Sequence, residues 1–298
     1  MWRGGWLLIS LVVLSGCGGG GKSGSGDEAK LRRLATDYVK ATTGDDPAAS
    51  CDLIADSVLK RAVGTTGERG RGICRKNLEG GPPQSDASDF AHFRVVGVDV
   101  EEARAEIKTS FTRGGVHVTD SIRAVRQGDD WFVLSTGTPT TPQGDLVLRV
   151  PSGAMLPTYE IGDIITVDIH AYDNAEPQRG DVVVFNPPPG AEAMRCGVRT
   201  HGLCPKPVPG KSDTRFVKRV AAVPGDRIGL RRGRVIRNGE PDTFPAKLCA
   251  PGNTECTFKG TITIPAGHYF VIGDNRGESD DSRYWGPIGS DAILGRVR

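Results

Sequence analysis

The sequence predicts two folded domains in series, an α+β domain over residues 27–135 and a mostly β domain over residues 146–298. Three observations lead to this fold class. The chain of 298 residues is long enough for two hydrophobic cores. Helical periodicity comes first and alternating, strand-like stretches follow it. From residue 146 onward only short β segments occur, broken by Gly, Pro and Asn.

The first domain should contain three helices followed by four strands. Asp27 can cap a helix that runs to about residue 42. Pro47, at the first helical position, should start a second helix that continues through Leu59, and a third short helix should hold Cys74. The strands are expected at residues 93–100, 103–111, 116–126 and 131–134.

Helices that precede an antiparallel meander make an α+β domain. This arrangement resembles the cone-like fold of nuclear-transport-factor-like domains. No paired carboxylates and no His/Asp dyad stand out in residues 27–135. The domain is therefore expected to act as a spacer or a partner-binding module.

A linker and an all-β domain should follow. Residues 136–145 contain Pro139 and Pro142 among Gly and polar residues, which is typical of a linker. The expected strands of residues 146–298 are 146–150, 164–169, 182–185, 216–223, 227–230, 235–237 and 269–272.

The N-terminal residues 1–17 have the pattern of an export signal. A positive start at Arg3 precedes an apolar run over residues 6–14, which is too short to span a bilayer. It ends in Leu14-Ser15-Gly16-Cys17, which resembles the lipobox of bacterial lipoproteins. The resemblance implies lipidation of Cys17, a Gly/Ser tether over residues 18–26, and anchoring to the outer face of the cell membrane. An ordinary signal peptide with a chance cysteine is the alternative.

The cysteine count agrees with an exported protein. With Cys17 assigned to lipid, six of the seven cysteines remain, which allow 15 connectivities. Disulfides form outside the cytoplasm. Proximity in sequence favours three local pairs, namely Cys51 with Cys74, Cys196 with Cys204 and Cys249 with Cys256.

Composition argues against several other partners. The formal charge of +2 includes no long basic run, so no nucleic-acid partner is expected. The five histidines fall at no metal-ligand spacing, so neither a metal nor another cofactor is predicted. The oligomeric state is left open.

Four stretches of the second domain, in order, resemble bacterial type I signal peptidases. They are Val150-Pro151-Ser152-Gly153-Ala154-Met155-Leu156-Pro157-Thr158, the segment from Gly162-Asp163 to Tyr172, Arg215-Phe216-Val217-Lys218-Arg219-Val220 with Pro224-Gly225-Asp226, and Gly273-Asp274-Asn275-Arg276-Gly277-Glu278-Ser279-Asp280-Asp281-Ser282-Arg283-Tyr284-Trp285-Gly286. The resemblance implies a serine endopeptidase fold with a Ser/Lys dyad, acting on signal peptides.

Lys218 is the candidate general base. A free lysine has a pKa near 10.4, which must fall by about 3 units for the amine to act near pH 7, and burial lowers it. A strand places Phe216, Lys218 and Val220 on one face, so Lys218 should lie between two apolar side chains. A solvated lysine on an edge strand is the alternative, and it requires Phe216 and Val220 to be exposed as well.

The resemblance also implies roles for four other residues. Ser279 would hold the amine of Lys218, and Asp281 and Arg283 would form a supporting ion pair. Ser152 would supply an oxyanion-hole hydroxyl, together with the backbone N–H of residue 154.

Ala154 stands where the family places its nucleophilic serine. A methyl group cannot attack a carbonyl carbon, so the sequence predicts an inactive protease whose groove still binds an extended exported polypeptide or signal-peptide-like segment. An active endopeptidase that uses Ser152, two residues away on the same face of an extended segment, is one alternative. If Ala154 is a substitution introduced for a natural serine, the natural protein is expected to be an active enzyme. The third alternative is a structural lipoprotein that binds partners through residues 27–135.

The position of the nucleophile box is unusual for this family. Its members carry a transmembrane segment shortly before the box, whereas here about 130 residues and a whole domain separate Cys17 from Val150. We therefore expect the size of that domain to hold the groove away from the bilayer.

Overall fold

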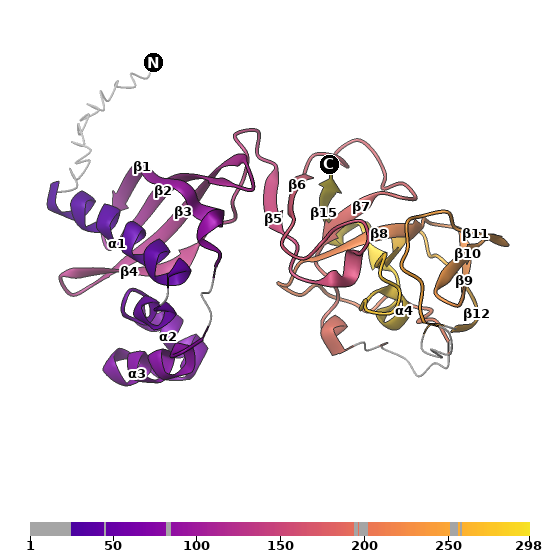
Figure 1. Cartoon of the computed structure of the whole chain (residues 1–298), viewed down its shortest axis with the longest axis horizontal. Helices are drawn as coiled ribbons and strands as arrows, with labels where there is room; N and C mark the ends of the chain where they lie inside the picture. The colour runs from indigo at the N-terminus through magenta and orange to yellow at the C-terminus, as the bar shows by residue number, and fades with distance from the viewer. Residues whose placement is uncertain are drawn as a thin grey trace, which may run out of the picture.

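The computed structural model describes residues 25–44, 46–81, 85–193, 196, 202–250, 256 and 258–298 (Figure 1). The expected signal peptide, Cys17 and most of the tether therefore lie outside the described residues. Among the helices that are described, none combines the length and the apolar character that a bilayer crossing requires.

The N-terminal part is a helix packed on a four-stranded antiparallel sheet, with a helical subdomain beside it (Figure 1). Leu31, Leu34 and Ala35 of the helix pack against Ile107 and the other inward side chains of the sheet. The elements are α1 (Ser25–Thr43), α2 (Asp56–Val63), α3 (Gly67–Leu78), β1 (Ala91–Glu101), β2 (Arg104–Arg113), β3 (Val116–Gln127) and β4 (Asp130–Thr136), with strand order β1-β2-β3-β4. The resemblance to a cone-like fold remains a prediction.

The prediction of one continuous second helix is wrong, because two separate helical segments occur there. A 3-10 helix, Pro47–Asp52, is separated from α2 by residues that pair with β4. The backbone N–H of Val133 donates to the Leu53 carbonyl (2.7 Å), and that of Ala55 donates to the Val133 carbonyl (2.8 Å). Backbone groups bound to a strand cannot also close helical hydrogen bonds, so the helix breaks there.

The C-terminal part is mostly β, with a seven-stranded and a four-stranded sheet. The larger sheet has the order β14-β13-β8-β7-β15-β6-β5 and the smaller one β11-β10-β9-β12. The strands are β5 (Leu146–Arg149), β6 (Ile164–Asp168), β7 (Val182–Phe185), β8 (Phe216–Ala222), β9 (Arg227–Arg231), β10 (Arg234–Arg237), β11 (Glu240–Pro241), β12 (Phe258–Thr263), β13 (His268–Ile272), β14 (Ile288–Gly289) and β15 (Ile293–Val297), and one short helix, α4 (Ser282–Trp285), joins them.

All seven predicted strands of this part occur, but β11, β12, β14 and β15 were not predicted. Two of these strands are only two residues long, and β12 and β15 each contain a glycine, which weakens the strand pattern. Gly295 in β15 is required by packing, since a Cβ there would overlap the backbone carbonyl of Asp168.

The three predicted disulfides are present. Cys51 is bonded to Cys74, Cys196 to Cys204, and Cys249 to Cys256. The first ties the 3-10 helix to α3, and the other two each close a short loop of the C-terminal part.

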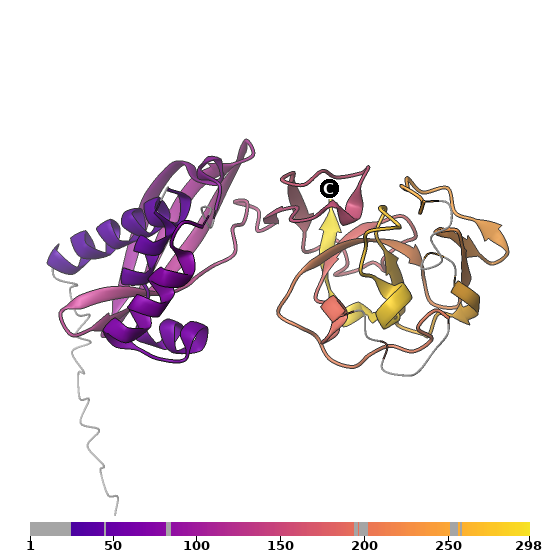
Figure 2. The same ribbon diagram turned by 60° about the horizontal axis from the view of Figure 1, so that its bottom comes forward.

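The segment predicted as a linker is fastened to both sheets. Thr140 and Thr119 exchange two backbone hydrogen bonds (2.8 and 2.9 Å), and the N–H of Val147 donates to the Pro139 carbonyl (2.9 Å). Figure 2 shows this connection running between the two parts. The segment therefore joins the edge of β3 to the edge of β5.

A buried ion pair also joins the two parts. Asp89, which is 6% exposed, accepts two hydrogen bonds from the Arg149 guanidinium at the end of β5, one of them from Nε at 3.0 Å. Arg113 Nε lies 3.9 Å from the same carboxylate, and Arg149 Nη1 donates to the Gly162 carbonyl at 2.8 Å. Phe111 packs beside these groups in a cluster that includes side chains of β5 and β6.

We expect Asp89→Ala to lower the free energy of unfolding by about 1–3 kcal/mol, because it leaves two arginines at the interface without their partner. The exposed pair of Asp99 with Lys108 provides a matched control in the same sheet. Asp99→Ala should cost less than about 1 kcal/mol. Urea unfolding of the full chain measures both values, and equal effects would contradict the structural role of Asp89.

Candidate active site

Three of the sequence-predicted site residues, Ser152, Ala154 and Lys218, line an open groove of about 320 Å³. One wall is the chain that follows β5, and the other is the start of β8 with the residues just before it. The groove is lined by Val150, Pro151, Ser152, Ala154, Met155, Thr214, Arg215, Phe216, Val217, Lys218, Glu278 and Asp280.

The first wall turns sharply at the candidate nucleophile position. Ser152 is extended (φ −148°, ψ 162°) and exposed, and a 3-10 turn over Gly153–Met155 follows it. Ala154 in this turn is only 8% exposed. The assumption of an extended segment through Ala154 is therefore wrong, because the turn ends the strand-like alternation after Ser152. Both side chains still line the groove.

The loop after β13 holds this turn in place. The backbone N–H of Asn275 donates to the Ala154 carbonyl, and its side-chain Nδ2 donates to the Gly153 carbonyl, each at 3.0 Å. Gly273 lies so close that a Cβ there would be 2.5 Å from the Ala154 carbonyl oxygen and would overlap the Ser279 side chain. The conformation of residues 153–155 is thus imposed by backbone contacts that do not involve the side chain at 154.

Lys218 is buried on the second wall, with 5% of its surface exposed. Its Nζ lies 5.1 Å from the centroid of the Phe216 ring, and Val220 on the same face is fully buried. Because Lys218 and Val220 are both buried, the alternative of a solvated lysine is excluded. Burial lowers the pKa of Lys218 to about 8, against the opposing charges of Asp281 and Asp280.

Asp281 and Arg283 form a fully buried ion pair. Arg283 Nε lies 2.7 Å from Asp281 Oδ1, and Nη2 lies 2.9 Å from Oδ2. Burial acts to raise the pKa of Asp281, but the charge and hydrogen bonds of Arg283 and the N–H of Gly273 hold it below its usual range. Because Arg283 neutralises this carboxylate, Asp281 is a weakened counter-ion for Lys218.

Ser279 is buried, but its predicted contact is not formed. Within the described residues no hydrogen bond joins its hydroxyl to Lys218 Nζ, and the hydroxyl instead contributes to the lowered pKa of Asp281. The Ser279 carbonyl accepts from Arg283 Nη2 at 2.9 Å. The roles of Ser279 and of Ser152 therefore remain predictions.

Sequence reasoning missed a second buried ion pair behind the groove. Asp274 was given no role there, whereas the structure shows it fully buried and bound to Arg219 through two contacts of 2.9 and 2.7 Å. Thr158, which follows the nucleophile turn, also donates to Asp274. The available signal was the charge of Arg219, which stands next to Lys218 in a strand whose other residues are apolar.

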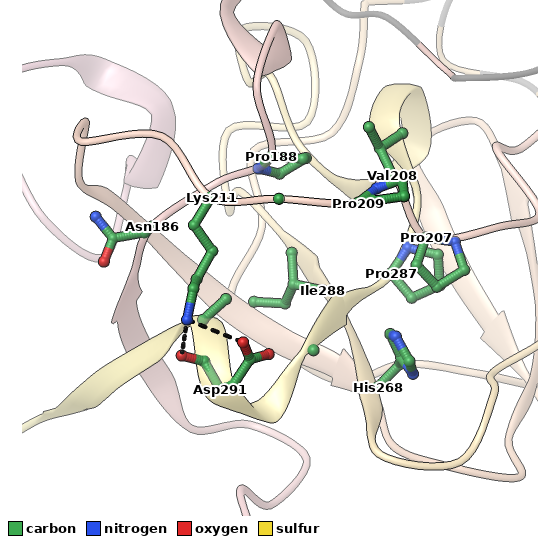
Figure 3. A pocket seen from close by; sticks show the side chains of 13 residues that line it. Asn186, Pro188, Pro207, Val208, Pro209, Lys211, His268, Pro287, Ile288 and Asp291 are labelled. Atoms are coloured by element: carbon green, nitrogen blue, oxygen red, sulfur yellow. Dashed lines mark hydrogen bonds and ion pairs between the residues drawn. The ribbon is translucent and has the colours of Figure 1, made fainter.

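A second depression, of about 310 Å³, lies at the edge strand β14 (Figure 3). Its lysine, Lys211, donates to the Asp291 carboxylate (2.9 Å) and is half exposed, so it lacks the burial that a lysine base needs. Prolines form much of its surface. Among the described residues no group of three metal-ligating side chains occurs.

The sequence profile of the signal peptidase family, peptidase S26, matches residues 146–298, which include the whole groove. The chain belongs to this family. It is 33% identical over 148 residues to a signal peptidase I of Leptolyngbya laminosa, with 50% of this chain and 64% of that protein covered. It is 32% identical over 177 residues to a signal peptidase I of Pseudomonas aeruginosa, with 46% and 54% covered.

A solved signal peptidase I from Enterococcus faecalis is also similar. It is 28% identical, with a TM-score of 0.29, and the match covers 41% of this chain and 97% of that one. This chain spans less than two thirds of the length of the curated signal peptidases it matches first.

We expect Gly273→Ala to destabilise the protein by about 1–3 kcal/mol, because the new methyl group overlaps the Ala154 carbonyl and Ser279. Gly277 in the same loop provides the matched control, since nothing lies within 4 Å of a Cβ there. Gly277→Ala should change the free energy of unfolding by less than about 0.5 kcal/mol. Urea unfolding of both variants tests the packing, and similar losses in the two would contradict it.

The pKa of Lys218 predicts a pH dependence of stability. Between pH 8, the approximate pKa of Lys218 in the folded chain, and pH 10.5, its usual pKa, the unfolded chain keeps the proton of this amine and the folded chain does not. The free energy of unfolding should therefore rise with pH across this window. Lys218→Met removes the titration. The free energy of unfolding is measured for both proteins, and the native value minus the variant value should increase from pH 8 to pH 10.5. A constant difference would show that burial does not lower the pKa of Lys218.

Proposed function

We propose that this protein binds extended polypeptide segments in a signal-peptidase-like groove and does not cleave them. The proposal rests on one observation, namely that Lys218 and Ala154 line the same groove. A buried lysine whose pKa is lowered to about 8 lines it, and the side chain at the nucleophile position is a methyl group.

The chemistry that is missing is the attack step. In a Ser/Lys dyad a neutral lysine removes the proton of a hydroxyl, whose oxygen then bonds to the substrate carbonyl. Ala154 has neither a proton to give nor a lone pair to donate. Two groups would stabilise an oxyanion, namely the Ser152 hydroxyl and the N–H of residue 154. Both can still donate hydrogen bonds to the carbonyl of a bound peptide.

The shape of the groove favours an extended ligand. Its walls are an extended segment that follows β5 and the first residues of β8, and such walls can take a peptide as an added strand. The partner would be an exported polypeptide or a signal-peptide-like segment. The lipobox-like Leu14-Ser15-Gly16-Cys17 supports a lipid anchor on Cys17 at the outer face of the cell membrane.

Two other functions remain testable. Ser152 is exposed and lines the same groove as Lys218, which favours an active endopeptidase that uses Ser152 as the nucleophile. A lipoprotein that acts through its N-terminal part would bind partners without residues 146–298.

We expect the native chain to bind a fluorescent peptide containing an Ala-x-Ala segment saturably and to leave it intact. Ala154→Ser should then cleave it at a rate at least on the order of 10³-fold above the native background, because only the attacking oxygen is missing. The double variant Ala154→Ser, Lys218→Met should be inactive, since it lacks the base. Fluorescence anisotropy measures binding, and separation of the products measures cleavage.

Cleavage by the native chain would overturn the proposal, and its loss in Ser152→Ala would then assign the nucleophile to Ser152. Absence of saturable binding to the native chain would remove the groove as a peptide site.

A further inference from the structure

We infer that a polypeptide bound in the groove continues onto the N-terminal sheet, where a second site binds its polar segment. This inference rests on the proposed function and extends it to the class of partner. The second site is a shallow depression of about 350 Å³ on the outer face of the sheet, which we call the hydroxyl face. It is lined by Val96, Lys108, Thr109, Thr119, Asp120, Ser121, Gly137, Thr138 and Thr140.

Both walls of the groove are fastened to the N-terminal part at the same end. On the first wall, Arg149 precedes Ser152 by three residues and binds Asp89. On the second wall, Arg215 precedes Lys218 by three residues, and its Nη2 donates to the Thr138 hydroxyl at 3.1 Å. A chain that leaves the groove at this end therefore meets the N-terminal part.

The hydrogen bond between Arg215 and Thr138 is where the two depressions meet. Arg215 lines the groove, and Thr138 lines the hydroxyl face. Lys218 lies three positions after Arg215, which corresponds to about 10 Å along an extended chain. A polypeptide that extends a few residues beyond the groove can thus reach the hydroxyl face.

The chemistry of the hydroxyl face fits neutral polar side chains. Within the described residues, no side-chain hydrogen bond of Thr119, Ser121 or Thr140 is formed, so these hydroxyls are available to a ligand. The two charged side chains of this face have opposite signs: Lys108 pairs with Asp99 at 2.7 Å, and Asp120 Oδ1 accepts from the Ser121 N–H at 2.7 Å, so the face selects neither charge. An apolar segment would leave the hydroxyls unpaired beneath it, which costs free energy, whereas Ser, Thr, Asn or Gln side chains can hydrogen-bond to them.

The test compares peptides of different length on the full chain. A short peptide carries only the groove-binding Ala-x-Ala segment, and longer ones add eight Ser, Thr, Asn and Gln residues at the N-terminal or the C-terminal end. We expect one of the two polar extensions, and not the other, to lower the Kd about tenfold. An apolar extension at the same end should bring no comparable gain.

Variants then locate the effect. Thr119→Val combined with Ser121→Ala should abolish the tenfold gain and leave the Kd of the short peptide unchanged. Thr263→Val, at an exposed strand threonine of the smaller sheet, is the matched control and should change neither value.

Four outcomes would overturn the inference. If the short peptide binds and neither polar extension improves its Kd, the hydroxyl face is not used and the proposed function stands. The same holds if the gain survives the double variant. An equal gain from an apolar extension would exclude a polar partner. If no peptide binds, the proposed function fails, and this inference fails with it.

Discussion

The ion pair between Asp281 and Arg283 controls the charge balance of the groove. Lys218 is almost fully buried, and an unpaired Asp281 near it would act as its counter-ion and raise its pKa. Arg283 instead binds both carboxylate oxygens and also donates to the Arg276 and Ser279 carbonyls. The lysine is therefore left with burial as its dominant influence, which is the condition under which an amine can lose its proton near neutral pH.

The same loop also shapes the other side of the groove. Asn275 and Gly273 hold residues 153–155 through backbone contacts and close packing, and Asp274 binds Arg219 of β8. None of these contacts uses the side chain at position 154. The form of the turn therefore does not depend on the side chain at position 154.

The N-terminal part contributes to the groove more directly than a spacer would. Asp89 fixes Arg149 just before the nucleophile turn, and Thr138 fixes Arg215 just before Lys218. The segment between the two parts is paired with strands on both sides. These contacts tie the residues just before both groove walls to the N-terminal part.

The sequence by itself determined the features that depend on local pattern and residue type. The alternation around Lys218 predicted its burial between Phe216 and Val220, and the spacing of the cysteines predicted all three disulfides. That position 154 carries a methyl group and no hydroxyl was also evident, since the identity of a residue needs no coordinates. Only the tertiary structure decided which distant groups meet. Three such contacts join residues that are far apart in sequence. They are the ion pair of Arg219 with Asp274, the pairing with β4 that interrupts the second helix, and the ion pair of Asp89 with Arg149. Such contacts depend on how the chain closes on itself, which no local periodicity encodes.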